Sequence, residues 1–588
     1  MPVTNNEIAD RLREIYQLMQ LAGENRFRAI AFDRAAQTIE SLNDDINDYI
    51  ANDNLTDIKG IGDSIAQDIT SYAETGTIKV LESLRQKIPA GVIKWLDISG
   101  LGPKNIAKIH SQLGISELEE LKEACKDGRV AELDGLGQKS AQKILDSIEW
   151  MEQFDERCRL DEATEIAQPI YDFLKKREGV KAIDVAGSLR RSLETIGDVD
   201  ILIGAEEKYI EALFDAFVDH ELVVDVLGRG DTKSSIRTKD GRQVDLRIVK
   251  PAQFPAALMY FTGSKEHNVV LRQRARERGL SLNEYGLFEL DDDGNTNFDQ
   301  PIGYESEADI YEHLDLHFVP PELREDRGEI QFFESNEKMN LVEEGDIRGV
   351  LHAHSTYSDG KFSINEMAQA CIDRGYEYLG LTDHSQTAAY AGGLSVDEIK
   401  QQWKEIDELN EQFASADINF RIFKGIESDI LSNGDLDYED EILEGFDFVI
   451  ASVHNGLTMN RDKMMNRFRK AISNPHTDIV GHPTGRLLLQ RDGSDLDINE
   501  LVELAAEHNT AIEINANPRR LDLDWRHGNK AREVGLMSSI NPDAHSKNGI
   551  DHISYGVRIA RKAKFGKDRI LNTKSADELA DWFANRSS

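Results

Sequence analysis

The sequence predicts a multidomain chain in which a helical N-terminal region is followed by an α+β region and then by a β/α barrel or a related layered α/β fold. Three observations predict it. A glycine-containing phrase recurs three times in the first 150 residues, two Asp residues alternate along an apolar segment near residue 200, and histidines gather behind short apolar segments after residue 350. A chain of 588 residues is too long for one core, so three or four domains are expected.

The composition is that of a globular protein without low-complexity segments. Hydrophobic residues make up 40% and charged residues 30% of the chain. No run of eighteen apolar residues occurs and the first twenty residues are amphipathic, so we expect no membrane segment and a cytoplasmic location. The cysteines have neither metal-ligand nor redox spacing, which fits a reducing compartment; they are Cys125, Cys158 and Cys371.

The formal net charge of −39 argues against a nucleic-acid partner, because the phosphate backbone attracts basic surfaces. Two explanations are compatible with such a partner. The acidic residues can lie away from a local basic groove, or the host can keep a saline cytoplasm that favours acidic surfaces. Net charge describes solubility and the long-range field, so a local site is judged by its own residues.

Short helices joined by glycine turns are expected throughout residues 1–150. The phrases "IKGIGDSIAQDI" (58–69), "ISGLGPKNIAKI" (98–109) and "LDGLGQKSAQKI" (133–144) repeat one pattern. Each glycine pair permits a tight hairpin whose backbone N–H groups, with the next helix, can face a phosphate. Three copies predict helix-hairpin-helix contacts to a DNA backbone, whereas one copy is often only a turn. The glycines concerned are Gly60, Gly62, Gly100, Gly102, Gly135 and Gly137.

Three acidic residues mark the region from 151 to 250, where we expect a helix near 161–178 and strands at 182–187, 198–204 and 243–249. Asp198 and Asp200 stand two apart on one strand and therefore share a face, and Asp245 lies on another strand. Three gathered carboxylates repel one another unless cations lie between them, which points to Mg²⁺ or Mn²⁺. The alternative is an exposed strand face, the commoner case for an isolated Asp-x-Asp.

The stretch "GSLRR" (187–191) supplies a glycine turn, a hydroxyl and two arginines able to hold a triphosphate just before these acids. In this order the sequence resembles family X DNA polymerases, the group of DNA polymerase beta. The resemblance implies a nucleotidyltransferase palm whose catalytic carboxylates hold two Mg²⁺ or Mn²⁺ ions for phosphoryl transfer. The residues that carry it are Gly187, Ser188, Asp198, Asp200 and Asp245.

The resemblance extends to "YFTGSKEHNVVLR" (260–272), which is similar to the family's nucleotide-pocket helix. It implies that Tyr260, Phe261 and Gly263 pack along the incoming sugar and that Asn268 and Arg272 face the nascent base pair. Plain core packing is the alternative for the two aromatic residues. The implied nucleotide-binding set, with phosphate contacts included, is Arg157, Ser188, Arg191, Gly197, Tyr260, Phe261, Gly263, Asn268 and Arg272.

One feature of the family is missing. Its first helix-hairpin-helix domain can carry a lysine that forms a Schiff base with an abasic sugar, and Asp68 stands at that position here. Only Arg28 and Arg34 are evident as cations for a 5′-phosphate pocket. We therefore expect no lyase activity of this type.

Histidines dominate the second half, since ten of the fifteen follow residue 350. Neutral imidazoles and carboxylates together are good ligands for Zn²⁺ and Mn²⁺. A single buried histidine is more often a core residue, but nine candidates at or just beyond apolar strands argue for a metal cluster. They are His352, His354, Asp359, His384, Glu427, His454, His482, Asp543 and His545.

The order of these ligands resembles the polymerase-and-histidinol-phosphatase (PHP) domain, a distorted β/α barrel that binds up to three Mn²⁺ or Zn²⁺ ions. By that resemblance one metal is held by His352, His354, Glu427 and Asp543, a second by the shared Glu427 with His454 and His482, and a third by Asp359, His384 and His545. Some relatives have histidine in place of Asp359, and the carboxylate favours Mn²⁺ over Zn²⁺. Candidate phosphate contacts are Lys361, Arg486 and Arg519 or Arg520.

The two resemblances imply six segments along the chain. They are an N-terminal helix-hairpin-helix domain (1–90), a DNA-binding helix-hairpin-helix fingers domain (91–150), the palm (151–250), a nucleotide-pocket subdomain (251–318), a linker (319–345) and the PHP phosphoesterase domain (346–588).

The function implied is a DNA-directed DNA polymerase that fills short gaps in DNA repair, joined to a metal-dependent 3′-5′ exonuclease. Its partners would be gapped or nicked double-stranded DNA and deoxynucleoside triphosphates, and we expect a monomer without membrane contact. The sequence does not choose among proofreading, removal of blocked 3′ ends, 3′-phosphatase activity and cleavage at abasic sites. Two alternatives stay open: a PHP domain that acts as a small-molecule phosphatase, and a non-catalytic DNA-end clamp.

Overall fold

The structure is a computed structural model, and it describes all residues except 1, 2, 4, 41–45, 53, 59, 99, 100, 155, 156, 292, 294, 337, 587 and 588. The chain divides into two compact units, unit 1 (Met1–Asp155) and unit 2 (Glu156–Ser588). Among the described residues, no helix combines the length and the apolar character needed to cross a bilayer. The predicted fold class is confirmed, as the following elements show.

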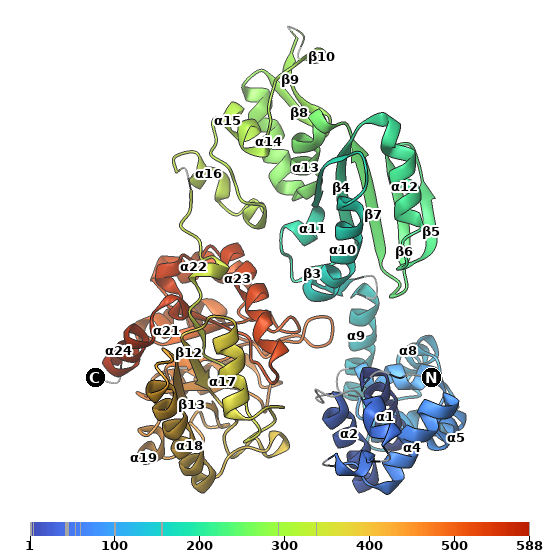
Figure 1. Cartoon of the computed structure of the whole chain (residues 1–588), viewed down its shortest axis with the longest axis vertical. Coiled ribbons are helices and arrows are strands. Elements are labelled where there is room, and N and C mark those ends of the chain that lie inside the picture. Colours follow the sequence, from blue (N-terminus) through green and yellow to red (C-terminus); the bar gives the residue numbers. More distant parts are fainter. Residues whose placement is uncertain are drawn as a thin grey trace. The chain divides into compact units, whose positions relative to one another are not determined.

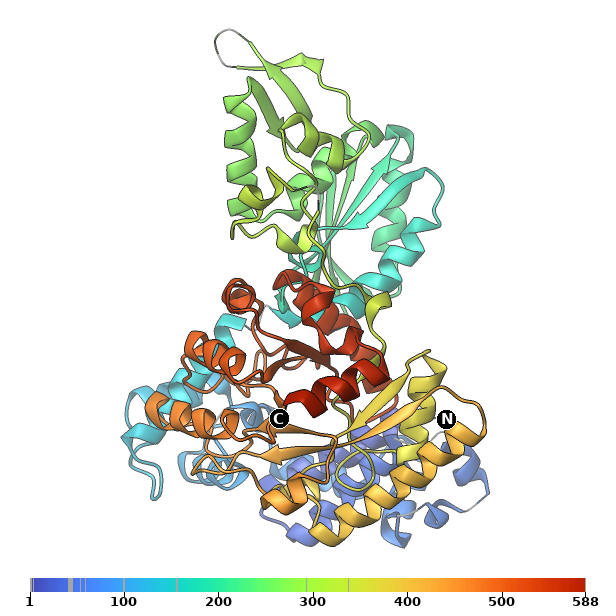
Figure 2. The same cartoon turned by 90° about the vertical axis from the view of Figure 1, so that its left-hand side faces the viewer.

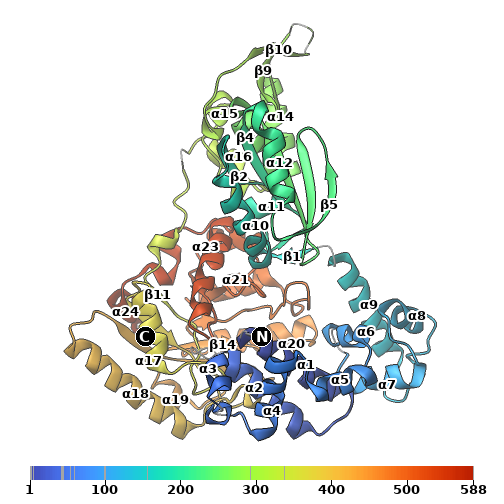
Figure 3. The ribbon, with the colours of Figure 1, turned by 45° about the vertical axis from the view of Figure 1, so that its right-hand side comes forward.

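Unit 1 is helical, and its described residues contain no strand (Figure 3). The amphipathic helices α1 and α2 pack against each other, and their apolar faces are buried in one core with Trp95. The helices are α1 (Asn5–Leu21), α2 (Arg26–Glu40), α3 (Ile46–Ala51), α4 (Asp63–Thr75), α5 (Lys79–Lys87), α6 (Ala90–Ile93), α7 (Pro103–Leu113), α8 (Leu118–Lys126) and α9 (Gln138–Phe154).

The three sequence repeats adopt one local geometry. In each copy the residue between the glycines donates its backbone N–H to the carbonyl three residues earlier, at 3.0, 3.1 and 2.9 Å, in the pairs Ile61–Ile58, Leu101–Ile98 and Leu136–Leu133. The second glycine of each copy then accepts hydrogen bonds from the first turn of α4, α7 or α9. The repeats are therefore structural hairpins and not only similar in sequence.

The glycines of these hairpins leave their backbone accessible to a ligand, as predicted. A Cβ added at Gly62, Gly102 or Gly137 would meet no atom within 4 Å, so their backbone faces open space. Gly60 and Gly135 adopt φ of 94° and 77°, a region that side chains with a Cβ rarely adopt. Gly100 lies outside the described residues.

Unit 2 begins with a five-stranded sheet of order β2-β4-β7-β6-β5, in which only β4 and β7 are parallel. Helices α10 and α12 lie against one face of this sheet (Figure 1). The predicted helix and the three predicted strands are present. The bounds are β1 (Cys158–Arg159), α10 (Leu160–Lys175), β2 (Val180–Val185), α11 (Gly187–Arg190), β3 (Thr195–Ile196), β4 (Val199–Ala205), α12 (Ile210–Val218), β5 (Val223–Arg229), β6 (Lys233–Thr238) and β7 (Gln243–Val249).

A smaller subdomain follows, with two helices against a three-stranded antiparallel sheet of order β10-β9-β8. The stretch predicted as a linker is not simply extended, because it forms a short helix and buries Arg324 and Glu329 completely. The bounds are α13 (Phe254–Thr262), α14 (Lys265–Glu277), β8 (Leu280–Asn283), β9 (Gly286–Leu290), β10 (Thr296–Pro301), α15 (Glu307–His313) and α16 (Glu329–Phe333).

The remainder of unit 2 is a seven-stranded, all-parallel sheet whose strands follow one another in chain order. A bridge between Ala353 and Ala544 joins the segments after the first and last strands, so the sheet nearly closes into a barrel. In Figure 2 these strands are surrounded by helices of the same part of the chain, which is coloured yellow to red. The strands are β11 (Gly349–Val350), β12 (Tyr378–Leu381), β13 (Arg421–Asp429), β14 (Phe448–Ser452), β15 (Ile479–Val480), β16 (Ala511–Asn515) and β17 (Ser538–Asn541).

Helices cover the outside of the barrel, as expected for parallel strands joined by crossovers. Several begin with a capping box, in which Ser363 or Ser395 accepts from the backbone of the first turn while a glutamate reaches back. The bounds are α17 (Ile364–Asp373), α18 (Val396–Ser415), α19 (Asp440–Leu443), α20 (Arg461–Ile472), α21 (Ile498–Glu507), α22 (Gly528–Val534), α23 (Ile553–Lys562) and α24 (Ala576–Arg586).

Candidate active sites

The three acidic residues predicted as a metal site come together on neighbouring strands. Asp200 on β4 and Asp245 on β7 are register partners, and Asp198 directly precedes β4. One ligand oxygen from each of the three lies within 4.8 Å of the others. This spacing lets the carboxylates share cations, as the sequence pattern predicted.

Their electrostatics differ because their surroundings differ. Burial, together with the neighbouring carboxylates of Asp198 and Asp245, raises the pKa of Asp200 to about 7. Burial also opposes ionisation of Asp245, but hydrogen bonds, chiefly from Lys233, keep its pKa low. The Lys233 ammonium lies 2.5 Å from Asp245 Oδ2, where it partly neutralises the cluster. Asp200 is therefore the carboxyl of the cluster whose ionised form is disfavoured.

The turn predicted to hold phosphates lies directly beside these acids. Gly187 has φ of 60°, and a Cβ there would lie 2.4 Å from Asp200 Oδ2, so only glycine fits this position. Ser188 follows it at the start of the short helix α11. Arg157 donates from Nε to Thr195 Oγ1 at 2.9 Å, and a Cβ at Gly197 would lie 3.6 Å from its guanidinium. Arg157 and Gly197, far apart in sequence, are thus neighbours.

The predicted nucleotide-pocket helix contributes the opposite wall. Tyr260 and Phe261 are half-buried rings in edge-to-face contact, with centroids 5.2 Å apart, so neither is a simple core residue. Gly263, at φ of 70°, ends α13, and Asn268 Nδ2 donates to the Tyr260 carbonyl at 2.8 Å. Arg272 is exposed on α14. Gly263 therefore separates α13 from α14, so the stretch 260–272, expected to resemble one helix, spans the end of one helix and the start of the next.

The histidine-rich region places its nine predicted ligands at the carboxyl ends of the barrel strands or just beyond them. Glu427 on β13 is the central member, because its two oxygens face imidazoles from several strands. Glu427 Oε1 lies 3.0 Å from His482 Nε2 and 3.2 Å from His454 Nε2. Glu427 Oε2 lies 2.9 Å from His384 Nδ1 and 3.6 Å from His352 Nε2.

Three groups of potential ligands fit around a cation each. Their members are His352, His354 and Asp543; His384, Glu427 and His454; and His354, Asp359, His384 and His545. These groups resemble the predicted division, with differences: His354 and His384 each belong to two groups. His482 contacts Glu427 but falls outside all three groups formed by the described residues.

The donor set fits metal ions, because several buried polar atoms lack a hydrogen-bond partner among the described residues. These atoms include His352 Nε2, His354 Nδ1 and His482 Nδ1. A buried, unpaired nitrogen or oxygen is costly, and coordination of a cation removes that cost. Imidazole nitrogens with carboxylate oxygens are the donors that Zn²⁺ and Mn²⁺ accept.

Charge is unevenly distributed among the imidazoles. Burial, reinforced by neighbouring cationic groups, lowers the pKa of His354 and of His482 to about 4. Burial also disfavours charge on His384 and His454, but the carboxylate of Glu427 and a second acid raise their pKa values to about 11 and about 9. His354 and His482 are thus neutral at physiological pH, the form that coordinates a metal.

Comparisons with known protein families agree with both halves. Residues 3–78 match a helix-hairpin-helix domain, 94–149 a SAM-like helix-hairpin-helix tandem, 257–325 the DNA polymerase beta thumb and 351–517 the PHP domain. The DNA polymerase/3′-5′ exonuclease PolX of Bacillus subtilis (strain 168) is 40% identical over 575 residues, which are 97% of this chain and 98% of the relative. The chain belongs to the PolX family.

Two further relatives match less of the chain. DNA polymerase lambda of Rattus norvegicus is 24% identical over 299 residues, 48% of this chain and 49% of the relative. A probable phosphatase of Thermoanaerobacter sp. (strain X514) is 27% identical over 233 residues, 38% of this chain and 89% of the relative. The extent of the Bacillus match shows that this member of the PolX family joins both halves in one chain.

Several acidic residues of this PolX-family barrel were not predicted from the sequence. Glu513 on β16 is fully buried, and its Oε2 lies 2.9 Å from His352 Nδ1. Asp429 holds His454 Nδ1 in the same way at 2.7 Å. Such carboxylates orient ligand histidines from behind. Glu513, in the apolar run "AIEIN", carried a detectable signal, since an acid in a buried strand needs a partner.

The candidate phosphate contacts are separated by the structure. Arg520 Nε lies 3.7 Å from Asp543 Oδ2, so its guanidinium borders the metal ligands. Arg486 instead donates to the carbonyls of Arg520 and Leu521 and to the Asp524 carboxylate. These bonds use its guanidinium to hold the loop together. Of these two arginines, Arg520 is therefore the better placed to contact a phosphate at the metal ligands.

Tyr390 also borders this site: its side chain is 68% exposed, and its ring centroid lies 6.3 Å from that of His384.

Proposed function

We propose that this chain is a DNA-directed DNA polymerase that fills short gaps in DNA repair and a metal-dependent 3′-5′ exonuclease that processes 3′ ends. The observation that carries the proposal is that one chain gathers both a three-carboxylate cluster and a cluster of eight histidines and carboxylates, with His482 beside Glu427. The Bacillus relative bears both activities in its name. The two halves would act on the same DNA ends.

In the polymerase half, Asp198, Asp200 and Asp245 would hold two Mg²⁺ or Mn²⁺ ions. When bound, such ions stabilise the attacking and leaving oxygens of phosphoryl transfer. The chain's own groups position the nucleotide: Ser188, Arg191, the Gly197 backbone and Arg157 at its β and γ phosphates, Tyr260, Phe261 and Gly263 along its sugar, and Asn268 and Arg272 at the nascent pair. The proximity of Arg157 to Gly197 supports the phosphate assignment.

In the barrel, the nine ligands would hold up to three Mn²⁺ or Zn²⁺ ions, with Glu427 shared between sites. When bound, clustered cations lower the pKa of a water and stabilise the charge that develops on a phosphoryl group. Arg520 would contact the phosphate of the 3′-terminal nucleotide. Asp359, a carboxylate among imidazoles, favours Mn²⁺ as the ion in its group.

DNA would be held through the helix-hairpin-helix glycines of unit 1. Gapped or nicked duplexes and deoxynucleoside triphosphates are the proposed substrates. A monomeric state, a cytoplasmic location and the absence of lyase activity stay predictions from the sequence, with Asp68 at the position of the lyase lysine.

Primer extension and 3′ digestion on one gapped DNA, assayed in Mg²⁺, Mn²⁺ and Zn²⁺, test the assignment. We expect His354→Ala to extend the primer but no longer degrade it, because His354 belongs to two ligand groups of the barrel only. The reciprocal variant, Asp198→Ala with Asp200→Ala, should degrade but not extend. Unchanged extension in that double variant would refute the polymerase site and favour a DNA-end clamp.

A second candidate function for the barrel is small-molecule phosphatase activity, favoured by the similarity to the Thermoanaerobacter probable phosphatase. Incubation of the metal-loaded protein with 3′-recessed DNA and, separately, with histidinol phosphate distinguishes the two. Hydrolysis of histidinol phosphate alone would overturn the exonuclease assignment. Digestion of the DNA at a rate that His354→Ala abolishes would support it.

A further inference from the structure

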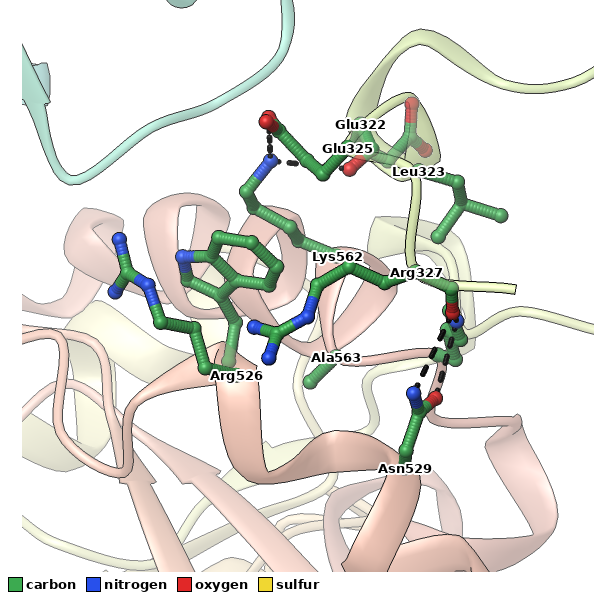
Figure 4. A pocket seen from close by; sticks show the side chains of 10 residues that line it. Glu322, Leu323, Glu325, Arg327, Arg526, Asn529, Lys562 and Ala563 are labelled. Atoms are coloured by element: carbon green, nitrogen blue, oxygen red, sulfur yellow. Dashed lines mark hydrogen bonds and ion pairs between the residues drawn. The ribbon is translucent and has the colours of Figure 1, made fainter. Parts of the chain in front are cut away.

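A fully buried lysine joins the barrel to the nucleotide turn of unit 2. Lys562 ends α23, and its side chain has no solvent exposure. Its Nζ donates to Glu325 Oε1 at 2.6 Å, to the Arg191 carbonyl at 3.0 Å and to the Glu322 carbonyl at 3.2 Å. Figure 4 shows the ammonium pointing toward Glu322 and Glu325. An uncompensated charge here would be costly, so these contacts constrain the neighbouring segment.

Glu325 carries the connection into the proposed nucleotide pocket. Its Oε1 also lies 3.0 Å from Arg191 Nε, and Arg191 Nη1 donates to the carbonyl of Thr262. The backbone N–H of Ser264 donates to the Arg324 carbonyl at 3.0 Å. The segment around Glu325 therefore contacts both walls of the pocket, the turn that ends at Arg191 and the turn after Thr262.

A second group of barrel residues holds the chain between that turn and the first catalytic aspartate. Glu194 is nearly buried and accepts from Trp525 Nε1 at 3.0 Å and from Arg526 Nη1 at 2.8 Å. Arg486 Nη2 lies 3.8 Å from the same carboxylate. All three residues follow strands of the barrel. The stretch from Arg191 to Asp198 is thus fixed to the barrel at two points.

We propose that Lys562, Glu325 and Glu194 are positioning residues through which the barrel aligns the phosphate turn of the polymerase site. The inference rests on the proposed function of that site. Glu325 is shared between the cations of Lys562 and Arg191. If Lys562 is removed, Arg191 is the cation of these two that remains beside the Glu325 carboxylate. The Arg191 guanidinium is then held more strongly by Glu325 and is drawn away from the nucleotide phosphates. Nucleotide binding then depends on a domain that does not contain the polymerase carboxylates.

The test compares full-length variants by steady-state kinetics on gapped DNA. For Lys562→Met we expect the KM for deoxynucleotide to rise about fivefold to tenfold, equivalent to the net contribution of roughly one hydrogen bond, with kcat within about twofold. Digestion of the 3′ end should stay within about twofold. Adding Glu325→Gln to Lys562→Met should lower the KM again only in part, because it removes the unpaired carboxylate but also the charged acceptor that positions Arg191. Lys567→Met is the matched control, because Lys567 is largely exposed.

Trp525→Phe is a milder variant that removes only the indole donor to Glu194 and keeps a ring, and it should raise the same KM about twofold to fourfold. A nucleotide KM within twofold of wild type in both variants, with unchanged thermal melting, overturns the proposal. Equal losses of extension and digestion with a lower melting temperature also overturn it, since they indicate general destabilisation. If wild type does not extend primers, the proposed function fails instead, and Asp198→Ala with Asp200→Ala separates these outcomes.

Discussion

A single carboxylate, Glu427, organises the imidazoles of the barrel. His352, His384 and His454 hold its pKa well below the usual range although burial opposes ionisation. The sequence predicted all of them as candidate metal ligands because each occurs at or after an apolar strand, and strand ends converge in a barrel. Which oxygen faces which imidazole was not predictable, since it depends on strand register and on near closure of the sheet.

Glu513 provides the prediction at this scale. Its carboxylate lies behind His352, and burial raises its own pKa. We expect Glu513→Gln to weaken metal retention about tenfold to a hundredfold, because a neutral amide no longer increases the basicity of the imidazole. Metal content after competition with a chelator measures the effect. Glu507→Gln, at the exposed end of α21, is the control. Retention within threefold of wild type would mean that Glu513 does not support the ligand.

At the element scale, strands with a regular apolar pattern could be predicted, whereas strands with a mostly polar or exposed sequence, and the pairing between strands, could not. The strands β2, β4 and β7 were predicted because their apolar residues are consecutive or alternate. Strands β5 and β6 were not, because β5 is an edge strand with exposed Val224 and Val226 and β6 is largely polar. Lys233, on β6, therefore reaches Asp245 through a strand pairing that one sequence does not reveal.

Helix α15 provides a prediction about acid stability. Glu307, its first residue, accepts from Arg190 at 2.7 and 3.1 Å and from Arg324 at 2.7 Å. Burial opposes ionisation, but the two arginines lower the pKa of Glu307 from 4.5 to about 2. Because the folded pKa is depressed, the stabilisation is present above pH 4.5 and is lost as the pH falls toward 2; at neutral pH it is worth about 3 kcal/mol.

The measurement is urea unfolding of wild type and Glu307→Gln between pH 7 and pH 3.5. The stability difference should narrow by more than about 1 kcal/mol at the lower pH, because the unfolded carboxylate becomes protonated first. Glu312→Gln, exposed on the same helix, should show a small difference that does not change with pH. A wild-type advantage that is independent of pH would contradict the assigned ion pairs.

At the scale of the whole molecule, the helical region, the α+β region and the barrel were predictable because each carries its own motif. The attachment of the barrel to the palm was not, since Glu194 and Trp525 are bonded across 331 residues and neither stands in a pattern. The net charge of −39 argued against DNA binding. Within unit 1, however, the repeats differ locally: after their glycines the second and third carry Lys104 and Lys139, where the first has Ser64.

This difference predicts which repeats bind the phosphate backbone. Lys104 and Lys139 are exposed beside Gly102 and Gly137, so they can neutralise phosphates that approach the hairpins despite the acidic surface elsewhere. In the full-length chain, Lys104→Ala with Lys139→Ala should weaken binding to gapped DNA. It should also reduce the slope of log affinity against log salt by about 1.8, or about 0.9 for each lost phosphate contact. Fluorescence anisotropy between roughly 50 and 200 mM salt measures both the affinity and the slope.

Ser64→Ala, at the equivalent position of the first repeat, is the matched control and should leave the slope unchanged. Neither exchange removes a buried group, since all three side chains are exposed on their helices, so the fold of unit 1 should be retained. An unchanged slope in the double lysine variant would place the phosphate contacts elsewhere in the chain. A slope that falls equally for Ser64→Ala would contradict the assignment of the lost phosphate contacts to the two lysines, because serine carries no charge.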